Sequence, residues 1–147
     1  MPRLLPPLLF VLLLAPLALL WLYHPEGMPM RADRPMPWDV PLPLGLAALL
    51  MARIQFGRAG AEINTFREPK GLVTGGLFRF TRNPMYLGFL LLLLAAAFFV
   101  NHWCALLAPL AFFVAANLWY IPHEEAALRR AFGKTYDDYA WRVRRWI

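Results

Sequence analysis

Two short polar clusters stand directly beside long apolar stretches, and their residue types are able to bind a charged ligand. The first, residues 81–88, reads Thr-Arg-Asn-Pro-Met-Tyr-Leu-Gly and supplies a cation, an amide and a phenol. The second, after a further apolar stretch, is His123-Glu124-Glu125. Ionisable residues beside a membrane-length segment are typical of a functional site. The clusters therefore suggest a ligand site at the membrane–water boundary, with a plain helical anchor as the alternative.

The first cluster has the pattern of a helix start. Asn83 is a favoured N-cap residue, and Pro84 fits the first helical position because its missing N–H would be unpaired there anyway. A helix N-terminus also presents free N–H groups and a partial positive charge, which favour a carboxylate or phosphate. Arg82 adds a full charge beside it, and Tyr86 and Gly88 lie on the first turn. Both a capped membrane helix and an anion site fit these residues.

The second cluster follows Pro122, which predicts that the preceding helix ends within residues 118–121 because proline cannot donate to the carbonyl four residues back. Adjacent carboxylates at Glu124 and Glu125 favour the first turn of a new helix. Beside lipid they also need a partner that neutralises them, either a cationic ligand or Arg82. The histidine spacing is not His-Glu-x-x-His, so we expect no metal site.

Few other polar residues lie within the apolar segments. Asn117 lies about one turn before the expected break, and polar groups at membrane depth usually face the bundle interior. It either lines a pocket or ties two helices together. No Ser/His/Asp or Cys/His set suggests covalent catalysis, and no phosphate-cradling Walker motif occurs. The single cysteine, Cys104, excludes an internal disulfide.

The elements that must position these clusters are apolar helices. The chain has 147 residues, of which 60% are apolar and 16% charged, and a mean hydropathy of +0.47. One domain is expected at this length, and a bilayer is the expected solvent. We therefore predict an all-α integral membrane protein with about four transmembrane helices. The apolar segments are residues 4–22, 40–54, 85–100 and 103–121.

Two of these segments need comment. The first has an apolar core that is longer than that of a signal peptide and lacks a small-x-small cleavage site, so we expect it to be retained. The second is the shortest, and it crosses a bilayer only if Arg53 and Arg58 extend their charges to the interface.

Topology follows from the positive charges. Four crossings with both termini inside put thirteen Lys and Arg residues in the cytoplasm and two, Arg31 and Arg34, outside. The net charge of +6 is therefore a topology signal, and no nucleic-acid partner is expected. We predict an integral protein of the cell inner membrane with both polar clusters on the cytoplasmic side.

The C-terminal segment has a helical apolar period with arginines on the other face. Such a segment is typical of a basic amphipathic helix in the plane of the membrane interface. Gly133 is expected to cap one helix, and Thr135 with Asp138 predicts a capping box at the start of the next. The apolar residues, spaced by three and four, are Leu128, Phe132, Tyr136, Tyr139, Val143 and Trp146.

Taken together, the two motifs resemble a known family. Gly-Leu-Phe-Arg-Phe-Thr-Arg-Asn-Pro-Met-Tyr-Leu-Gly at 76–88, followed by Pro-His-Glu-Glu-x-x-Leu-x-x-x-Phe-Gly-x-x-Tyr-x-x-Tyr-x-x-x-Val-x-Arg-Trp-Ile at 122–147, is similar to the isoprenylcysteine carboxyl methyltransferase superfamily, which includes the phospholipid methyltransferases. The resemblance covers residues 57–147. We therefore predict a single domain, 1–147, with an N-terminal helical hairpin at 1–56 and a cofactor-binding core at 57–147.

The resemblance implies a membrane enzyme that uses S-adenosyl-L-methionine and releases S-adenosylhomocysteine. Its acceptor would be a membrane lipid or lipophilic small molecule: a phospholipid amine, or an isoprenylcysteine-like carboxylate or thiol. The first motif would hold the amino-acid end of the cofactor through Arg82, Asn83, Pro84, Tyr86 and Gly88.

The second motif would complete the site. The resemblance assigns Glu124 and Glu125 to the ribose, adenine or ammonium side of the cofactor, and Arg145 to the substrate or to closing the site. Glu125 and Arg145 are the candidate catalytic residues, and His123 and Asn117 are counted with the candidate cofactor ligands. We expect the methyl transfer to depend mainly on alignment, as a direct displacement does.

One position departs from the pattern of the isoprenylcysteine enzymes. They usually read Arg-His-Pro where this chain reads Arg82-Asn83-Pro84, and its Asn-Pro-Met-Tyr-x-Gly form is nearer to the phospholipid-methylating branch. The alternative function is a non-enzymatic membrane scaffold or small-ligand binder that retains the fold.

Overall fold

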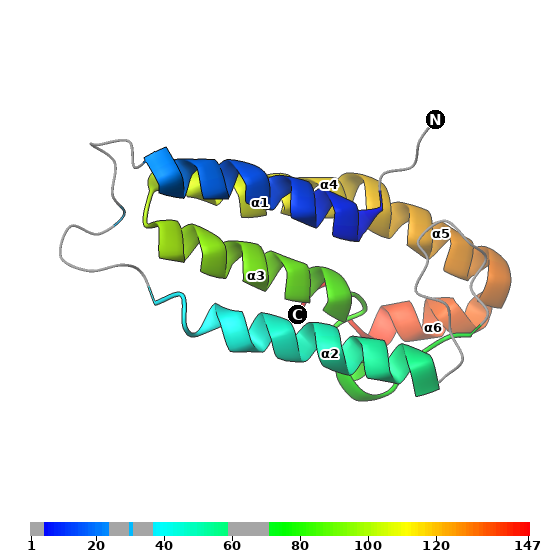
Figure 1. The fold of residues 1–147 in the computed structure, drawn as a ribbon. Helices are drawn as coiled ribbons and strands as arrows, with labels where there is room; N and C mark the ends of the chain where they lie inside the picture. Colours follow the sequence, from blue (N-terminus) through cyan, green and yellow to red (C-terminus); the bar gives the residue numbers. More distant parts are fainter. Residues whose placement is uncertain (1–4, 24–29, 31–36, 59–70) are drawn as a thin grey trace.

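The computed structural model describes residues 5–23, 30, 37–58 and 71–147, and its regular elements are helices (Figure 1). The prediction of an all-α chain is therefore confirmed for these residues. The elements are α1 (Pro6–Tyr23), α2 (Pro41–Arg58), the 3-10 turn η1 (Gly76–Arg79), α3 (Pro84–Val100), the 3-10 turn η2 (Trp103–Leu106), α4 (Leu107–Ala115), the π-helical turn η3 (Ala116–Tyr120), α5 (Ile121–Phe132) and α6 (Lys134–Arg142).

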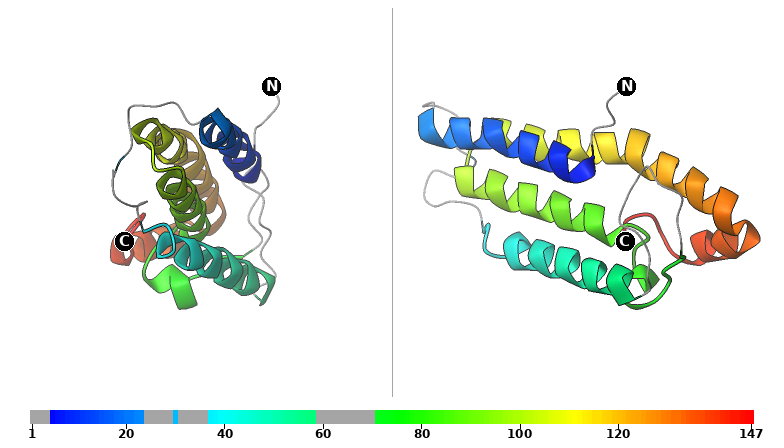
Figure 2. Two further views of the ribbon diagram at one scale, coloured as in Figure 1. Left: turned by 60° about the vertical axis from the view of Figure 1, so that its left-hand side comes forward. Right: turned by 45° about the vertical axis from the view of Figure 1, so that its right-hand side comes forward.

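The helices α1 to α4 form a bundle in which α3 packs against each of the other three. Successive long helices run in opposite directions, so the end of α2, the start of α3 and the end of α4 lie at the same end of the bundle (Figures 1 and 2). The helices α5 and α6 cover that end. This topology brings the two polar clusters, distant in sequence, to one place.

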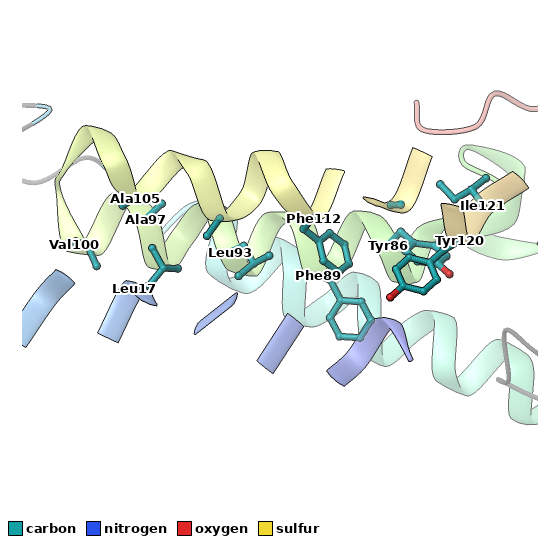
Figure 3. Packing of buried hydrophobic residues seen from close by; sticks show 12 residues of the cluster. Leu17, Tyr86, Phe89, Leu93, Ala97, Val100, Ala105, Phe112, Tyr120 and Ile121 are labelled. Carbon is teal, nitrogen blue, oxygen red and sulfur yellow. The ribbon is translucent and has the colours of Figure 1, made fainter. Parts of the chain in front are cut away.

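The bundle core is built from apolar and aromatic side chains. Leu93, Phe112 and Ile121 are fully buried, and the rings of Phe89 and Phe112 lie 5.8 Å apart in an edge-to-face contact. Figure 3 shows these rings between the helices, with Tyr86, Tyr120 and Ile121 toward the end where α5 begins. Aromatic pairs at such distances add to the stabilisation that burial gives.

The outer surface of the bundle carries many exposed large apolar side chains, as expected where hydrocarbon replaces water as the solvent. Among the described residues, two helical runs are long and apolar enough to cross a bilayer, Pro6–Tyr23 and Trp103–Phe132. The shorter apolar helix Pro84–Val100 is α3, and α2 does not meet that measure. Four crossings therefore stay a prediction.

The predicted helix break at Pro122 is wrong. The chain stays helical from α4 through α5, and the turn before the proline widens into the π-helical η3. The N–H of Ile121 reaches the carbonyl of Ala116, five residues back. A wider turn leaves room for a proline ring that would crowd the carbonyl four residues back in an α-helix, so the helix continues without a break.

The connection between α5 and α6 is partly as predicted. Gly133 has a φ of +50°, which favours glycine, and its N–H donates to the carbonyl of Arg129, so the predicted cap of α5 is confirmed. The predicted capping box of Thr135 and Asp138 is wrong. The helix α6 begins at Lys134, two residues before the start at Tyr136 that an N-cap at Thr135 implies, and among the described residues no side chain caps it.

The predicted apolar face of α5 and α6 is present, but protein covers it. Phe78 of η1 packs against Tyr136 and Tyr139, and together they form a second apolar cluster. The 3-10 turn η1 and the neighbouring residues Leu72 and Val73 pack on this face, and the position of the two helices in the plane of the membrane interface stays a prediction. Other side chains packed against the cluster are Phe56, Leu72, Val73, Leu128, Phe132, Ala140 and Val143.

Candidate functional site

A cavity of about 70 Å³ lies where the second apolar cluster meets the two polar motifs. Its polar lining consists of Arg82, Asn83, Glu124 and Glu125, which come from the start of α3 and from α5. The rest of the lining is mostly apolar and aromatic. Its side chains are Phe56, Leu72, Val73, Phe78, Leu128, Tyr136 and Tyr139.

Glu125 is the centre of an ionic network. Its Oε1 lies 3.1 Å from Nη1 of Arg82 and accepts a 3.1 Å hydrogen bond from Nε of Arg145. Its Oε2 accepts a 2.8 Å bond from Nη2 of Arg145 and lies 4.0 Å from Nη1 of Arg129. The Glu125 side chain is only 8% exposed. Because a buried carboxylate is costly unless paired, this network explains how Glu125 is accommodated.

Arg82 joins the two motifs. In addition to Glu125, its Nη1 donates a 3.2 Å hydrogen bond to the hydroxyl of Tyr136. Its Nε is buried and has no hydrogen-bond partner among the described residues. A buried donor without a partner is costly in a folded protein, so this atom is a candidate contact for a bound acceptor group.

Asn83 stands at the predicted N-cap position of α3, but its side chain makes no capping hydrogen bond. Instead its Nδ2 donates to the carbonyl of Arg145 at 2.9 Å, and Oγ1 of Thr81 donates to the same oxygen at 3.2 Å. The N–H of Arg82 donates to the carbonyl of Arg144 at 3.0 Å. The backbone after α6 is therefore held against the start of α3.

Tyr86 lies on the first turn of α3 and reaches the second motif. Its hydroxyl donates a 2.8 Å hydrogen bond to Oε1 of Glu124, and its ring stacks on Tyr120 at 6.2 Å. Tyr86 is buried and belongs to the bundle core, whereas Glu124 lines the cavity. This contact ties the orientation of the Glu124 carboxylate to the membrane bundle.

Six of the ten predicted site residues lie outside the cavity lining; two of them, Tyr86 and Arg145, contact the lining residues Glu124 and Glu125. Pro84 is buried at the start of α3, and Gly88 faces α2, where an added Cβ would meet Cγ of Leu49 at 2.7 Å. Asn117 contacts Trp146, and His123 is exposed on α5. The structure thus brings together Arg82, Asn83, Glu124, Glu125 and, through its ion pair, Arg145.

Two tyrosines near the arginines have altered acidity. Burial raises the pKa of Tyr139 to about 12, and the neighbouring Tyr136 acts in the same direction, while Arg82 opposes them. Burial also raises the pKa of Tyr136, followed by the negative charge of Glu125. Both phenols are thus neutral hydrogen-bond donors near neutral pH. The Tyr139 hydroxyl donates to the carbonyl of Phe78 at 2.7 Å.

Sequence reasoning missed several residues of the site. Thr81 and Phe78 were quoted in the motif without a role, and Tyr136 and Tyr139 were assigned only to an apolar helix face. The signal that could have found the tyrosines is their hydroxyl group, since a buried tyrosine usually needs a hydrogen-bond partner. No local pattern indicates that Gln55 of α2 accepts from the N–H of Leu77 at 3.2 Å.

The arrangement suits a ligand that carries both charged and apolar parts. Arg82, Glu124 and Glu125 line the cavity together with aromatic and aliphatic side chains, and Arg129 and Arg145 pair with Glu125. Guanidinium groups bind carboxylates, carboxylates accept from hydroxyl or ammonium groups, and aromatic side chains pack on planar rings.

Comparisons with known proteins identify the family of the chain. A sequence profile of the family described as "Phospholipid methyltransferase" matches residues 42–135, which is more than half of the chain. In rice, Oryza sativa subsp. indica and subsp. japonica, a protein named "Probable protein-S-isoprenylcysteine O-methyltransferase" is 34% identical over 81 residues. That alignment covers 53% of this chain and 41% of the rice protein.

A bacterial relative is shorter. An uncharacterized protein of Haemophilus influenzae is 38% identical over 63 residues, which is 43% of this chain and all of that protein. The chain thus aligns with less than half the length of the rice relatives. No solved structure matches it significantly.

Proposed function

Because the chain belongs to the phospholipid methyltransferase family, we propose that it is a membrane methyltransferase that takes its methyl group from S-adenosylmethionine. One observation carries the proposal: the two motifs that the family resemblance singled out meet at one cavity, through Arg82 and Glu125 at 3.1 Å. Activity on a lipid or lipophilic acceptor is part of the proposal, as are the roles of the individual residues.

The polar and aromatic groups of the cavity are of the types that would bind the parts of S-adenosylmethionine. The Nε of Arg82, which has no hydrogen-bond partner in the described part of the chain, suits a carboxylate oxygen, the carboxylate of Glu124 suits hydroxyl or ammonium groups, and the aromatic lining suits a purine. Pockets that hold a complete small molecule measure about 300–1,000 Å³. The cavity of about 70 Å³ is smaller, so binding of the whole cofactor requires the site to widen.

When bound, S-adenosylmethionine supplies an activated methyl group on a positively charged sulfur. We propose that Arg82 and Asn83 orient its amino-acid end. Glu124, fixed by Tyr86, accepts from its hydroxyl or ammonium groups. Since both oxygens of Glu125 are engaged by arginines, Glu125 holds Arg82 and Arg145 in place. These residues act by alignment, which is the main requirement of a direct displacement.

The acceptor is proposed to approach from the bilayer. Its class is a phospholipid amine or an isoprenylcysteine-like carboxylate or thiol, and the positive side chain of Arg145 suits a carboxylate or phosphate on it. Four crossings of the inner membrane, with both termini and the cavity on the cytoplasmic side, complete the proposal. The positive-inside pattern of the sequence supports that orientation.

Incubation with methyl-labelled S-adenosylmethionine tests the proposal. Purified protein in vesicles of a native lipid extract should transfer label to a lipid-soluble product, which mass spectrometry then identifies. Asn83→Ala serves as the matched variant, because it removes one side chain at the cavity, and it should lower the labelling. Absence of labelled product at every lipid composition, with the protein folded, would contradict methyl transfer to a lipid.

A further inference from the structure

Asn117 lies in the π-helical turn Ala116–Tyr120, close to the junction of α4 and α5. Turns of this width are rare inside helices and occur frequently at functional sites. Here the sequence supplies a local cause, because Pro122 follows directly and has no N–H to donate. The wider turn lies beside the C-terminal segment, which the Asn117 side chain contacts.

Both ends of the Asn117 amide are used. Its Nδ2 donates to the carbonyl of Phe113 at 3.1 Å, and its Oδ1 accepts a 3.0 Å hydrogen bond from Nε1 of Trp146. The indole ring of Trp146 also packs on Phe113, with ring centroids 5.1 Å apart. Trp146 is therefore seated by one hydrogen bond and one ring contact on the membrane helix.

The residue before Trp146 is the one that reaches the candidate site. Arg145 makes two hydrogen bonds to Glu125, and its carbonyl accepts from Asn83 and Thr81. The helix α6 ends at Arg142, and Val143, whose N–H still donates to the carbonyl of Tyr139, is extended, so residues 144–146 continue the chain without helical structure. Their position is fixed by α6 at one end, by the hydrogen bonds from the start of α3 to the carbonyls of Arg144 and Arg145, and by Trp146 at the other end.

We propose that Asn117 and Trp146 are positioning residues that seat Arg145 on Glu125. Through Arg145 they set the affinity of the site for a nucleoside cofactor, an inference that rests on the proposed function. Asn117, a candidate cofactor ligand in the sequence, would then position Arg145 without contacting the cofactor. Trp146 directly follows Arg145 in the chain, so loss of the hydrogen bond that anchors the Trp146 indole should shift Arg145 relative to Glu125.

The variant Trp146→Phe tests the proposal, because it keeps an aromatic ring against Phe113 and removes only the indole N–H. Binding of S-adenosylhomocysteine, measured by calorimetry, should weaken about threefold to tenfold, as expected for one hydrogen bond. Asn117→Leu should weaken it to a similar degree. The double variant should be no weaker than either single variant, because both remove the same bond. Trp141→Phe, at a tryptophan that is 90% exposed on α6, is the matched control and should bind as the wild type does.

Hydrogen exchange measures, without any ligand, whether residues 143–146 remain packed against the start of α3. The N–H of Arg82 donates to the carbonyl of Arg144, so its hydrogen exchange should accelerate about threefold to tenfold in Trp146→Phe and Asn117→Leu. The melting temperature should stay near that of the Trp141→Phe control.

The outcomes separate the two proposals. If the wild type does not bind S-adenosylhomocysteine, the proposed function fails, and the exchange of the Arg82 N–H alone decides whether Asn117 and Trp146 seat the tail. If the wild type binds and both variants bind equally well, with unchanged exchange, the positioning role is wrong while the proposed function stands. Additive losses in the double variant also contradict it, because they mean that the two side chains act separately.

Discussion

The bundle of α1 to α4 and the cap formed by η1, α5, α6 and residues 143–146 are held together differently. In the bundle, apolar side chains pack over long stretches, and α2 approaches α3 closely at Gly45 and Gly88. In the cap, the decisive contacts are single polar pairs between distant segments, such as Glu125 with Arg82 and Arg145. Packing in the bundle is distributed over long helices, whereas the cap combines a smaller apolar cluster around Phe78, Tyr136 and Tyr139 with a few polar pairs.

This difference suggests how the two regions respond to change. A bundle residue acts mainly on stability, because many neighbours share its contacts. A residue of the cap acts on stability and on the candidate site together, because the groups that hold the cap also line the cavity. Variants in each region therefore test whether the bundle and the cap respond differently.

The largest effect is expected for Glu125→Gln. The change removes the charge that pairs three arginines and leaves Arg82, which is 14% exposed, without its anion. Loss of one partner of a buried pair costs about 3–5 kcal/mol, so the free energy of unfolding in detergent should fall by about that amount. Binding of S-adenosylhomocysteine should be lost as well.

The exposed ion pair of Arg129 and Asp137, at 3.0 Å, supplies the control. Asp137→Asn should change the free energy of unfolding by less than about 1 kcal/mol, because solvent screens such a pair. Equal effects of the two variants would show that the Glu125 network is no more than a surface ion pair.

A smaller loss in the free energy of unfolding is expected at alkaline pH. The folded-state pKa of Tyr139 is raised from 10 to about 12, so the folded protein keeps this proton at a pH where the unfolded chain loses it. The resulting stability is fully present below pH 10 and is lost as the pH rises toward about 12. At about 1.4 kcal/mol per unit, the loss is about 2–3 kcal/mol.

Denaturant unfolding between pH 9 and pH 12 measures this loss, with those limits set about one unit below and about two above the ordinary tyrosine pKa. Tyr139→Phe is the matched variant: it should be less stable at neutral pH, since the carbonyl of Phe78 loses its donor, but its stability should fall less steeply with pH. The same slope in both proteins would contradict the assignment to Tyr139.

A bundle variant, Gly88→Ala, should cost about 1–3 kcal/mol without a specific effect on ligand affinity. Its Cβ would meet Cγ of Leu49 at 2.7 Å and the carbonyl oxygen of Gly45 at 3.0 Å, so α2 and α3 must separate. Gly57→Ala, at a position of α2 with nothing within 4 Å, should be neutral or slightly stabilising. If Gly88→Ala weakened binding of S-adenosylhomocysteine while stability stayed unchanged, Gly88 would belong to the site, as the sequence predicted.

The smallest effect is expected for Tyr86→Phe. The ring stays on Tyr120, and the 2.8 Å hydrogen bond to Glu124 is lost. We expect a loss of about 1 kcal/mol in binding of S-adenosylhomocysteine, about fivefold in affinity, with little change in melting temperature. The opposite pattern, a lower melting temperature with unchanged affinity, would place Tyr86 in the bundle alone.

The sequence predicted the bundle well because an apolar segment in the local sequence indicates each helix. The apolar segments 40–54 and 85–100 correspond to α2 (Pro41–Arg58) and α3 (Pro84–Val100), and the N-cap position of Asn83 is confirmed. Pro122 misled the prediction because the rule for proline assumes an α-helical turn, and a π-helical turn accommodates the ring.

The cap was predictable only in part. The residue types of both motifs pointed to a shared site, and a pairing of Arg82 with the glutamates was one of the alternatives considered. The donors that Asn83 and Trp146 supply to distant acceptors have no period or spacing in the sequence. They arise from how the segment after α6 crosses the start of α3, which is a property of the tertiary structure.

The central claim is that the two motifs together form a cofactor site, and calorimetry with S-adenosylhomocysteine tests it most directly. Purified wild-type protein should bind the ligand saturably at one site, and Glu125→Gln should lose that binding while Asp137→Asn retains it. Absence of binding to folded wild-type protein at concentrations up to about 1 mM, which corresponds to about −4 kcal/mol, would contradict the claim.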